Sequence, residues 1–367
     1  MNSLIAAIGV CLISAGSGGA LAYVNGTSTL DQCVMVLDLE REEIQRVGRS
    51  LGDSAPAWSP DGAHLAFSSR TERGQSIFVY DPSGGGLAEV PHAAPWNGNP
   101  VWSPDGSRIA YISGEGGEDM ATALTVFHVE QNAEARWGAS TSVFMPTWMP
   151  NNKLILALDP DQALNPDGVD MRAIKEEWAT EGALLLAACL PGARGFSTEI
   201  VLATRTQSMA VLPVVLSDTD RYAELRPVAS RQGDRVAYES NDGGDREIFV
   251  LGKRGVVNVS NHREADWNPQ WSRDGKSLLF ESFRDGRRGI YLVYVDTARV
   301  MPIAVHAGSD CWSPAWSADG KTIAYVSGQS GHPEIYQCGA EATGHRQLSN
   351  ADRTSAGSYA IQPVWRP

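Results

Sequence analysis

Carboxylate and aromatic side chains recur in the segments that precede a repeated Trp-x-x-x-Gly element. A carboxylate attracts a cationic group, and an aromatic face adds cation–π attraction to the same group. If these segments gather at one end of the fold, they form an acidic, aromatic surface suited to a cation or to a basic segment of a protein partner. The alternative is that they are ordinary solvated loop residues beside aromatics that pack on neighbouring strands. The candidate partner-binding residues are Asp53, Trp96, Asn99, Glu224, Asp266, Trp267, Asn268, Asp310, Trp312 and Tyr359.

Histidines and cysteines are the other residues that could do chemistry. His92, His262 and His306 stand 9 or 10 residues before their Trp, at the same place in three repeats. Imidazole binds metals and titrates near neutral pH, but equivalent positions in different repeats are well separated, so a position that tolerates any polar residue is the simpler explanation. We therefore expect no metal and no cofactor. No CxxC spacing occurs among the cysteines, which are Cys11, Cys33, Cys189, Cys311 and Cys338.

Nucleic-acid binding, calcium binding and hydrolysis are not favoured. The formal net charge of −13 opposes contact with a phosphate backbone. The acidic, Gly-containing loops at 70–74, 241–245 and 284–288 lack the spaced carboxylates of an EF-hand, and we predict hairpin turns there, on the rim opposite the candidate residues. We expect no hydrolase domain and no catalytic motif.

A five-residue element marks a structural repeat. Its four clear copies are Trp58–Gly62, Trp102–Gly106, Trp271–Gly275 and Trp316–Gly320, each with a proline two residues before the tryptophan. Asp followed by Gly fits a tight turn in which Gly takes a positive φ, so this Asp is structural. Short apolar runs follow each copy, and four short strands per repeat predict the blade of an all-β propeller.

Weaker copies extend the repeat. They centre on Trp148, Ala229 and Trp365, and the interval from Trp148 to Ala229 is 81 residues, close to two repeats. Trp178–Gly182 resembles a degenerate copy, so we favour a single propeller of eight four-stranded blades; without this copy the count is seven. The competing interpretation of this segment is a helix over 170–180.

The two ends of the chain are expected to complete one blade. Residues 21–47 hold three strand-like runs, and the last copy stops at Trp365 with one strand formed. A shared blade removes the open edges that promote aggregation. Residues 1–19, an apolar run followed by small residues, are typical of a signal peptide, with an uncleaved membrane anchor as the alternative. We therefore assign 1–19 to this leader and 20–367 to the propeller, in a periplasmic or otherwise exported protein.

The pattern Pro-x-Trp-Ser-Pro-Asp-Gly, followed by Ile-Ala-Tyr or Leu-Ala-Phe, resembles the TolB-type propeller repeat family over residues 20–367. This resemblance implies a propeller that is commonly exported and has a protein-interaction role. The chain departs from TolB in having no room for the small N-terminal α/β domain, so TolB's partner contacts are not carried over. Similar repeats occur in the gating propeller of prolyl oligopeptidase-type peptidases, which remains an analogy of fold.

We therefore expect an exported, non-enzymatic propeller that binds a protein or peptide partner, basic in character, at the mouth of its channel. Nucleic acid is not expected as a partner, and membrane contact is expected only through an uncleaved N-terminal segment. One alternative is a propeller enzyme, such as a carbohydrate lyase or hydrolase acting in the channel funnel. Another is a structural subunit of an envelope complex.

Overall fold

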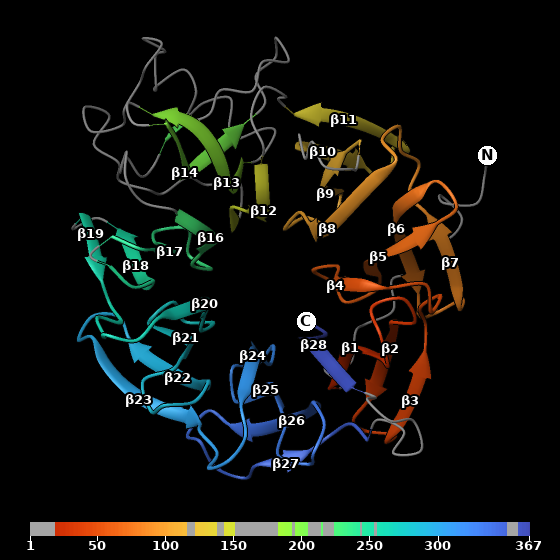
Figure 1. Ribbon diagram of the computed structural model, residues 1–367. Coiled ribbons are helices and arrows are strands. Elements are labelled where there is room, and N and C mark those ends of the chain that lie inside the picture. Colours follow the sequence, from red (N-terminus) through yellow and green to blue (C-terminus); the bar gives the residue numbers. More distant parts are fainter. Residues whose placement is uncertain are drawn as a thin grey trace.

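The computed structural model describes residues 19–115, 122–137, 143–150, 183–192, 195–204, 214–215, 224–242, 244–252, 255–350 and 359–367. Strands and turns make up these ranges, and no helix occurs among them. The strands form five four-stranded antiparallel sheets and one eight-stranded sheet. The larger sheet consists of two groups of four joined by a single parallel residue pair, Gln75 with Trp96. Five sheets and two groups give seven blades among the described strands, arranged as a ring around a central opening (Figure 1).

The blades follow one another along the chain, and each is named here by its strands from the channel outward. The first three are β28 (Tyr359–Trp365), β1 (Ala20–Gly26), β2 (Cys33–Asp38) and β3 (Glu43–Arg46); β4 (Ser54–Trp58), β5 (Leu65–Thr71), β6 (Gly74–Asp81) and β7 (Gly86–Glu89); and β8 (Trp96–Trp102), β9 (Arg108–Gly114), β10 (Thr122–His128) and β11 (Ala133–Trp137). The next two are β12 (Val143–Trp148), β13 (Ala183–Gly192), β14 (Gly195–Thr204) and β15 (Val214–Val215); and β16 (Glu224–Ala229), β17 (Val236–Ser240), β18 (Glu247–Gly252) and β19 (Gly255–Asn258). The last two are β20 (Asp266–Trp271), β21 (Ser277–Ser282), β22 (Gly289–Tyr294) and β23 (Arg299–Ala304); and β24 (Cys311–Trp316), β25 (Thr322–Ser327), β26 (Glu334–Gly339) and β27 (Arg346–Gln347).

The two ends of the described chain lie in one blade. β28 pairs antiparallel with β1, and Leu21 stands opposite Trp365. Beyond β28, Arg366 Nε donates to the Gly62 carbonyl at 2.7 Å, and the Arg366 guanidinium lies 5.4 Å from the Trp58 ring centroid in the next blade. These contacts tie the C-terminal strand to β1 of its own blade and to the blade that follows. The leader assigned to 1–19 lies outside the described residues, except for Gly19.

The strand pairing corrects the interpretation of the long interval between Trp148 and Ala229. β13, which begins at Ala183, pairs with β12, the strand that ends at Trp148. The apolar run after Trp178 is therefore the second strand of the blade that starts at β12, and it opens no blade of its own. The described strands thus give the alternative count of seven rather than the favoured eight. Trp178 and the proposed helix over 170–180 lie outside the described residues.

The repeated element forms the turn that its residues predict. In its first copy, the Gly62 N–H donates to the Ser59 carbonyl at 2.8 Å, and Gly62 has a φ of 67°. Asp61 accepts the Ser59 hydroxyl and the Ala63 N–H, at 2.5 and 2.9 Å. These local hydrogen bonds hold the pKa of Asp61 below its usual value, although partial burial opposes the shift. The aspartate is therefore architectural, as the sequence analysis expects.

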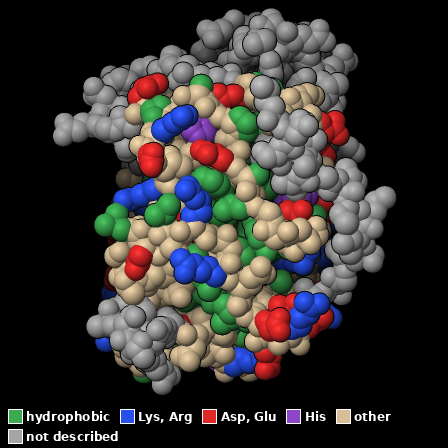
Figure 2. Space-filling view, turned by 90° about the vertical axis from the view of Figure 1, so that its right-hand side faces the viewer, with side chains coloured by type: hydrophobic (Ala, Val, Ile, Leu, Met, Phe, Trp, Pro, Cys, Tyr) green, Lys and Arg blue, Asp and Glu red, His purple; other side chains and the backbone are tan. Residues whose placement is uncertain are grey.

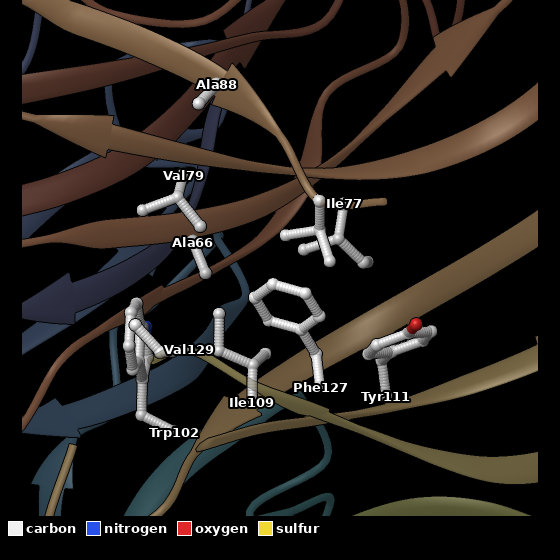
Figure 3. Close-up of a cluster of buried hydrophobic side chains, with 10 residues drawn as sticks. Ala66, Ile77, Val79, Ala88, Trp102, Ile109, Tyr111, Phe127 and Val129 are labelled. Atoms are coloured by element: carbon white, nitrogen blue, oxygen red, sulfur yellow. The ribbon is translucent and has the colours of Figure 1, made fainter. Parts of the chain in front are cut away.

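Neighbouring blades are joined by packing and by indole hydrogen bonds. The apolar cluster between the β4–β7 and β8–β11 blades includes Ala66, Val79, Ile109 and Phe127, all nearly excluded from solvent (Figure 3). Trp102 packs in this cluster, and its indole N–H donates to the Ala57 carbonyl of the preceding inner strand at 3.1 Å. The same bond joins three other blade pairs, where the donors are Trp148, Trp271 and Trp365 and the acceptors are Val101, Val228 and Ala315. Each bond satisfies a buried donor while it fixes the spacing of two blades.

The outer surface is mixed in character. Figure 2 shows acidic and basic side chains scattered among polar and apolar ones on one side of the ring, without a band of one charge. Single exposed apolar residues such as Ile44 and Leu87 are ordinary on a protein surface. Within the described residues, no helix has the length and apolarity needed to cross a bilayer.

Removing residues 360–367 should lower the melting temperature sharply, because it deletes β28 and exposes the edge of β1. Thermal unfolding followed by circular dichroism measures the effect. Ile44→Ser, on exposed β3 of the same blade, is the control and should change stability by less than about 0.5 kcal/mol. If the truncated chain has the same melting temperature as the full-length protein, β28 does not stabilise the propeller as expected.

Trp102→Phe should destabilise the protein by about 1 kcal/mol more than Trp58→Phe. Both tryptophans are buried, but only the Trp102 indole donates to a carbonyl; the Trp58 N–H has no partner among the described residues. The difference isolates the indole hydrogen bond from the loss of packing, which is common to both substitutions. Urea unfolding of the two variants checks it, and equal losses would show that this bond does not hold the blades together.

Candidate protein-binding site

A cavity of about 520 Å³ lies at the centre of the ring and is lined by all seven inner strands. Each inner strand contributes the same element, a residue followed by proline. The prolines are Pro56, Pro100, Pro146, Pro227, Pro269, Pro314 and Pro363. The cavity is therefore built by the repeat itself, and its character depends on the residue that stands before each proline.

The residue before each proline has an unusual backbone. All seven have a positive φ, between 50° and 57°, although none is glycine; they are Ala55, Asn99, Met145, Arg226, Asn268, Ser313 and Gln362. The pairing register of each inner strand shifts at this point, as in a β-bulge. A bulge changes the direction in which a side chain points. Here it places one side chain per blade at the cavity wall.

Side chains of the preceding blade bind the backbone N–H groups at three of these bulges. Gln362 accepts from Ala55 at 3.1 Å, and Glu239 accepts from Asn268 at 2.7 Å. Glu281 accepts from Ser313 at 2.9 Å. The bulged conformation of one blade is thus stabilised by the blade before it.

Glu239, on β17, is buried and held by two arginines. Its carboxylate lies 3.3 Å from Arg226 Nε and 3.1 Å from Arg246 Nη1. Burial raises the pKa of Glu239, while the Asn268 N–H and the two guanidinium groups oppose the shift. Arg226 lines the cavity, whereas Arg246 does not.

Glu281 occupies the same position on β21 and is also fully engaged. Its Oε1 accepts from Asn268 Nδ2 at 2.7 Å, and Arg288 Nε and Nη2 both lie 2.5 Å from its Oε2. The Arg288 guanidinium lies over the rings of both Trp267 and Trp312, 5.4 and 5.5 Å from their centroids.

Trp267 also contacts a side chain that is open to solvent. Its ring centroid lies 5.2 Å from that of Phe283, which is 41% exposed. One end of the channel therefore carries an aromatic patch around a cation. We call Trp267, Phe283, Arg288 and Trp312 the mouth patch.

The structure divides the ten sequence-predicted residues into three groups. Asn99, Trp267 and Asn268 line the cavity. Three carboxylates lie inside their blades: Asp53, Glu224 and Asp266 are all 0 or 1% exposed. The remaining four, which do not line the cavity, are Trp96, Asp310, Trp312 and Tyr359.

The three buried carboxylates occupy one repeat position, two residues before the bulge. Asp53 Oδ2 accepts the N–H groups of Val34, Arg49 and Ser50, at 3.3, 2.7 and 3.1 Å. A Cβ at Gly48 would lie 2.0 Å from the same oxygen, so only glycine fits there. Asp53 therefore organises the loop that enters β4, and it does not face the channel.

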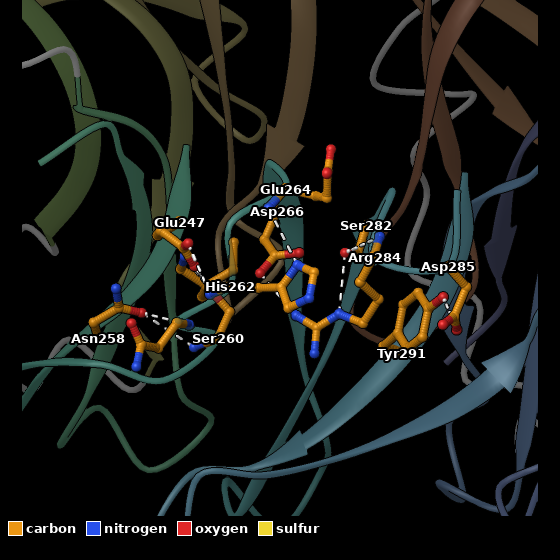
Figure 4. Close-up of polar contacts among 12 residues, drawn as sticks. Glu247, Asn258, Ser260, His262, Glu264, Asp266, Ser282, Arg284, Asp285 and Tyr291 are labelled. Atoms are coloured by element: carbon orange, nitrogen blue, oxygen red, sulfur yellow. Dashed lines mark hydrogen bonds and ion pairs between the residues drawn. The ribbon is translucent and has the colours of Figure 1, made fainter. Parts of the chain in front are cut away.

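Asp266 belongs to a polar network between two blades (Figure 4). Arg284 Nη2 donates to Asp266 Oδ2 at 2.8 Å. Glu247, on β18, accepts the Ser260 hydroxyl and the His262 N–H. Burial raises the pKa of Glu247 to about 7, and the neighbouring Asp266 carboxylate adds to the shift.

Of the four residues outside the cavity wall, Asp310 is exposed and the three aromatics are partly buried. Tyr359 accepts from Gln32 Nε2 at 3.0 Å, and Trp96 pairs with Gln75 where two blades join. Of these four, only Trp312 belongs to the mouth patch, where its ring contacts Arg288. The predicted set is thus spread around the ring rather than gathered at one point.

The hairpin turns lie on the same rim as the candidate residues, and the expectation that they lie on the opposite rim is wrong. Asp266 pairs with Ser282, so the turn after Ser282 stands beside the start of β20. The Arg288 carbonyl, in turn, accepts from Cys311 N at the start of β24, at 2.8 Å. This misplacement hid Arg288 and Phe283 from the sequence analysis.

Arg226 and Gln362 were missed for a different reason. Both precede the repeated proline, a position whose orientation toward the channel becomes visible only in the bulged strand. The signal was present in the alignment of the prolines. That alignment predicts that the residue before each proline, and not the segment upstream of it, faces the channel.

The segment Gly48–Gly52 has the Gly-x-Ser-x-Gly spacing of a hydrolase nucleophile, contrary to the expectation that the chain holds no such motif. It lies in the loop between β3 and β4, whereas a nucleophile elbow joins a strand to a helix. The Ser50 hydroxyl accepts from Arg46, and its N–H donates to Asp53. Its surroundings are those of a loop tied down by a carboxylate.

The histidines occupy separate blades. His92 bonds to Ser76, and His262 accepts from the Glu264 N–H. His306 contacts Tyr325 and the ring of His345, and burial lowers its pKa. In the part of the chain that is described, no three His, Cys, Asp or Glu side chains are grouped as a metal site, and Cys33, Cys311 and Cys338 are buried and unpaired.

Comparisons with known proteins agree with this architecture. Residues 14–183 and 211–367 match the TolB beta propeller domain family. Over 221 residues the chain is 30% identical to the Tol-Pal system protein TolB of Bordetella parapertussis. The aligned region covers 54% of this chain and 48% of that protein. The chain therefore spans about half the length of the curated relative that it matches.

Solved structures show the same fold at low identity. TolB from Acinetobacter baumannii is similar with a TM-score of 0.55 and 15% identity, over 95% of this chain and 67% of that one. The propeller domain of the Trilobed protease from Pyrococcus furiosus is similar with a TM-score of 0.62 and 12% identity, over 90% of this chain and 92% of that one. An acylaminoacyl peptidase from Pyrococcus horikoshii is similar with a TM-score of 0.62 and 14% identity, over 91% of this chain and 51% of that one. These likenesses concern the fold alone.

Glu247→Gln should remove a pH dependence of stability. Because the pKa of Glu247 is raised in the folded state from 4.5 to about 7, the folded protein binds a proton that the unfolded chain has already lost. The free energy of unfolding of the wild type should therefore fall as the pH rises from about 4.5 to about 7. Gln resembles the protonated acid, so the variant should match the wild type at pH 4.5 and be more stable at pH 8. If the stabilities of the variant and the wild type differ by the same amount at every pH from 4.5 to 8, this assignment is wrong.

Proposed function

This chain belongs to the TolB beta propeller domain family, and we propose that it is an exported, non-enzymatic propeller that binds an extended segment of a protein partner at the channel mouth. The observation that carries the proposal is the mouth patch at one end of a cavity of about 520 Å³. Aromatic and arginine side chains that are open to solvent beside a cavity are typical of the sites where a protein partner is anchored.

The backbone around the cavity is held in place by contacts between blades, which favours the binding of a partner. Three of the seven bulges on the cavity wall are held by side chains of the preceding blade. A wall fixed in this way is pre-organised, so a partner segment orders less of the protein when it binds.

A non-enzymatic role is proposed because the charged groups of the cavity are already engaged. Among the described lining residues, the acidic and basic side chains are Arg226, Glu281 and Arg288. Glu281 is held by Arg288, Asn268 and Ser313, so it is poorly placed to act as a general acid or base. Two of the similar solved structures named above belong to peptidases, but their likeness concerns the fold alone.

Export and envelope assembly are proposed on two grounds. The sequence of residues 1–19 is typical of a signal peptide. The curated relative is named as a protein of the Tol-Pal system, and its 30% identity over part of the chain makes a related assembly the reasonable proposal.

Photo-crosslinking in cells that produce the protein tests this function. A photoreactive amino acid at Asn99, on the cavity wall, should capture a discrete protein partner, because it replaces a side chain at the channel itself. The same amino acid at Arg299, exposed on outer strand β23, is the control and should capture little. The products are identified by mass spectrometry of the envelope fraction.

Trp267→Ala in the Asn99 crosslinking chain should reduce the captured product several-fold, since it removes part of the mouth patch. The proposal fails if capture occurs only at Arg299. It also fails if Trp267→Ala leaves the yield from Asn99 unchanged while the protein stays folded.

A further inference from the structure

We infer that the channel mouth between β16 and β24 takes a carboxylate side chain of the partner, so that the segment it binds is acidic. This inference rests on the proposed function and assigns the charge of the partner segment. It reverses the basic partner that the sequence suggests, for a reason that lies in the burial of the acidic residues.

Five acidic side chains beside the channel are not available to a basic partner, and Asp310, which is exposed, does not line the cavity. Asp53, Glu224 and Asp266 are inside their blades. Glu239 and Glu281 are each 1% exposed at the side chain, and each is bonded to a backbone N–H and to at least one guanidinium. A carboxylate whose oxygens are already occupied adds little attraction for an incoming cation.

The arginines, by contrast, are reachable. Arg226 is 46% exposed at the side chain and uses Nε for Glu239, and within the described residues its two terminal nitrogens have no protein partner. Arg288 is 31% exposed and uses Nε and Nη2 for Glu281, which leaves Nη1 without a protein partner in the same ranges. Both line the cavity. Guanidinium N–H groups that remain unpaired are suited to a carboxylate.

The local charge is opposite to that of the whole chain. The cavity wall carries Arg226 and Arg288 against Glu281, a sum of +1, in a protein with a formal net charge of −13. Glu239 and Arg246 behind the wall cancel each other. An acidic segment is thus repelled by most of the surface and attracted at this point, which favours a single mode of docking.

The surroundings of Arg288 strengthen such an interaction. Its guanidinium lies over the rings of Trp267 and Trp312, 5.4 and 5.5 Å from their centroids, so aromatic faces cover part of it. Phe283 and Trp267 extend this apolar surface outward. A carboxylate of an extended peptide is therefore bound beside an apolar wall, where charge-assisted hydrogen bonds are stronger than in water.

Binding of capped model peptides tests the inference. The probes are Gly/Ser nonapeptides, acetylated and amidated, that carry three Glu, three Gln or three Lys, and anisotropy of an uncharged dye reports the affinity. The Glu peptide should bind at least about tenfold more tightly than the other two at low salt, and the advantage should shrink as salt is added. A fourth Gly/Ser peptide with a free C-terminal carboxylate and no Glu separates a chain terminus from a side chain as the source. It should bind as weakly as the Gln peptide.

Two arginines offer a matched pair of variants. Arg226 and Arg246 pair with the same Glu239 carboxylate and are equally exposed, but only Arg226 lines the cavity. Arg226→Gln should weaken the Glu peptide about tenfold, whereas Arg246→Gln should change its affinity by less than about twofold. Melting curves of both variants exclude unfolding as the cause.

Equal losses in the two variants, tightest binding of the Lys peptide, equal binding of the uncapped peptide or no binding of any peptide would each overturn the inference. Tightest binding of the Lys peptide that Trp267→Ala abolishes would refute the acidic assignment and leave peptide binding at the mouth intact. The crosslinking experiment at Asn99 tests the proposed function separately.

Discussion

The architecture depends on one backbone constraint, a non-glycine residue with positive φ directly before proline in every inner strand. Proline restricts the residue before it, and a left-handed conformation in a residue with a side chain costs on the order of 1 kcal/mol or more. The arrangement persists because neighbouring blades support it. Gln362, Glu239 and Glu281 each bind the N–H at the bulge of the following blade. The shape of the channel wall and the contacts between these successive blades therefore depend on each other.

The same constraint decides how charge is distributed at the channel. In each inner strand, the bulged residue and the residue two positions earlier lie in different environments. The position two residues earlier points into the blade, where Asp53 and Asp266 are buried and bonded. The bulged position reaches the cavity, where Arg226 lies. An acidic chain thus keeps several of its carboxylates out of the channel and presents guanidinium groups at the mouth.

The contacts between blades are not uniform around the ring. Four tryptophans donate to the carbonyl of the preceding inner strand, and each ties two blades together. Trp58 and Trp316 occupy the same repeat position without an acceptor among the described residues. Both line cavities, of about 450 and 500 Å³, between neighbouring blades. The repeat therefore fixes the ring while it allows individual blade interfaces to differ, and Arg366 reinforces the interface at Trp58.

The sequence by itself determined the all-β repeat, the Ser-Pro-Asp-Gly turn at Gly62 and the strands that β1 and β28 supply, because each follows from local residue chemistry or from the period of the repeat. Tertiary structure alone decided the count of seven blades among the described strands, since only the pairing of β13 with β12 shows where the run at Ala183 belongs. It also decided the site. Burial of Asp53 and Asp266, and exposure of Arg226 and Arg288, depend on which way a bulged strand turns each side chain and on which rim a hairpin lies. Those directions are set by contacts between blades, through residues 29 and 32 positions apart in the sequence, which a local pattern does not contain.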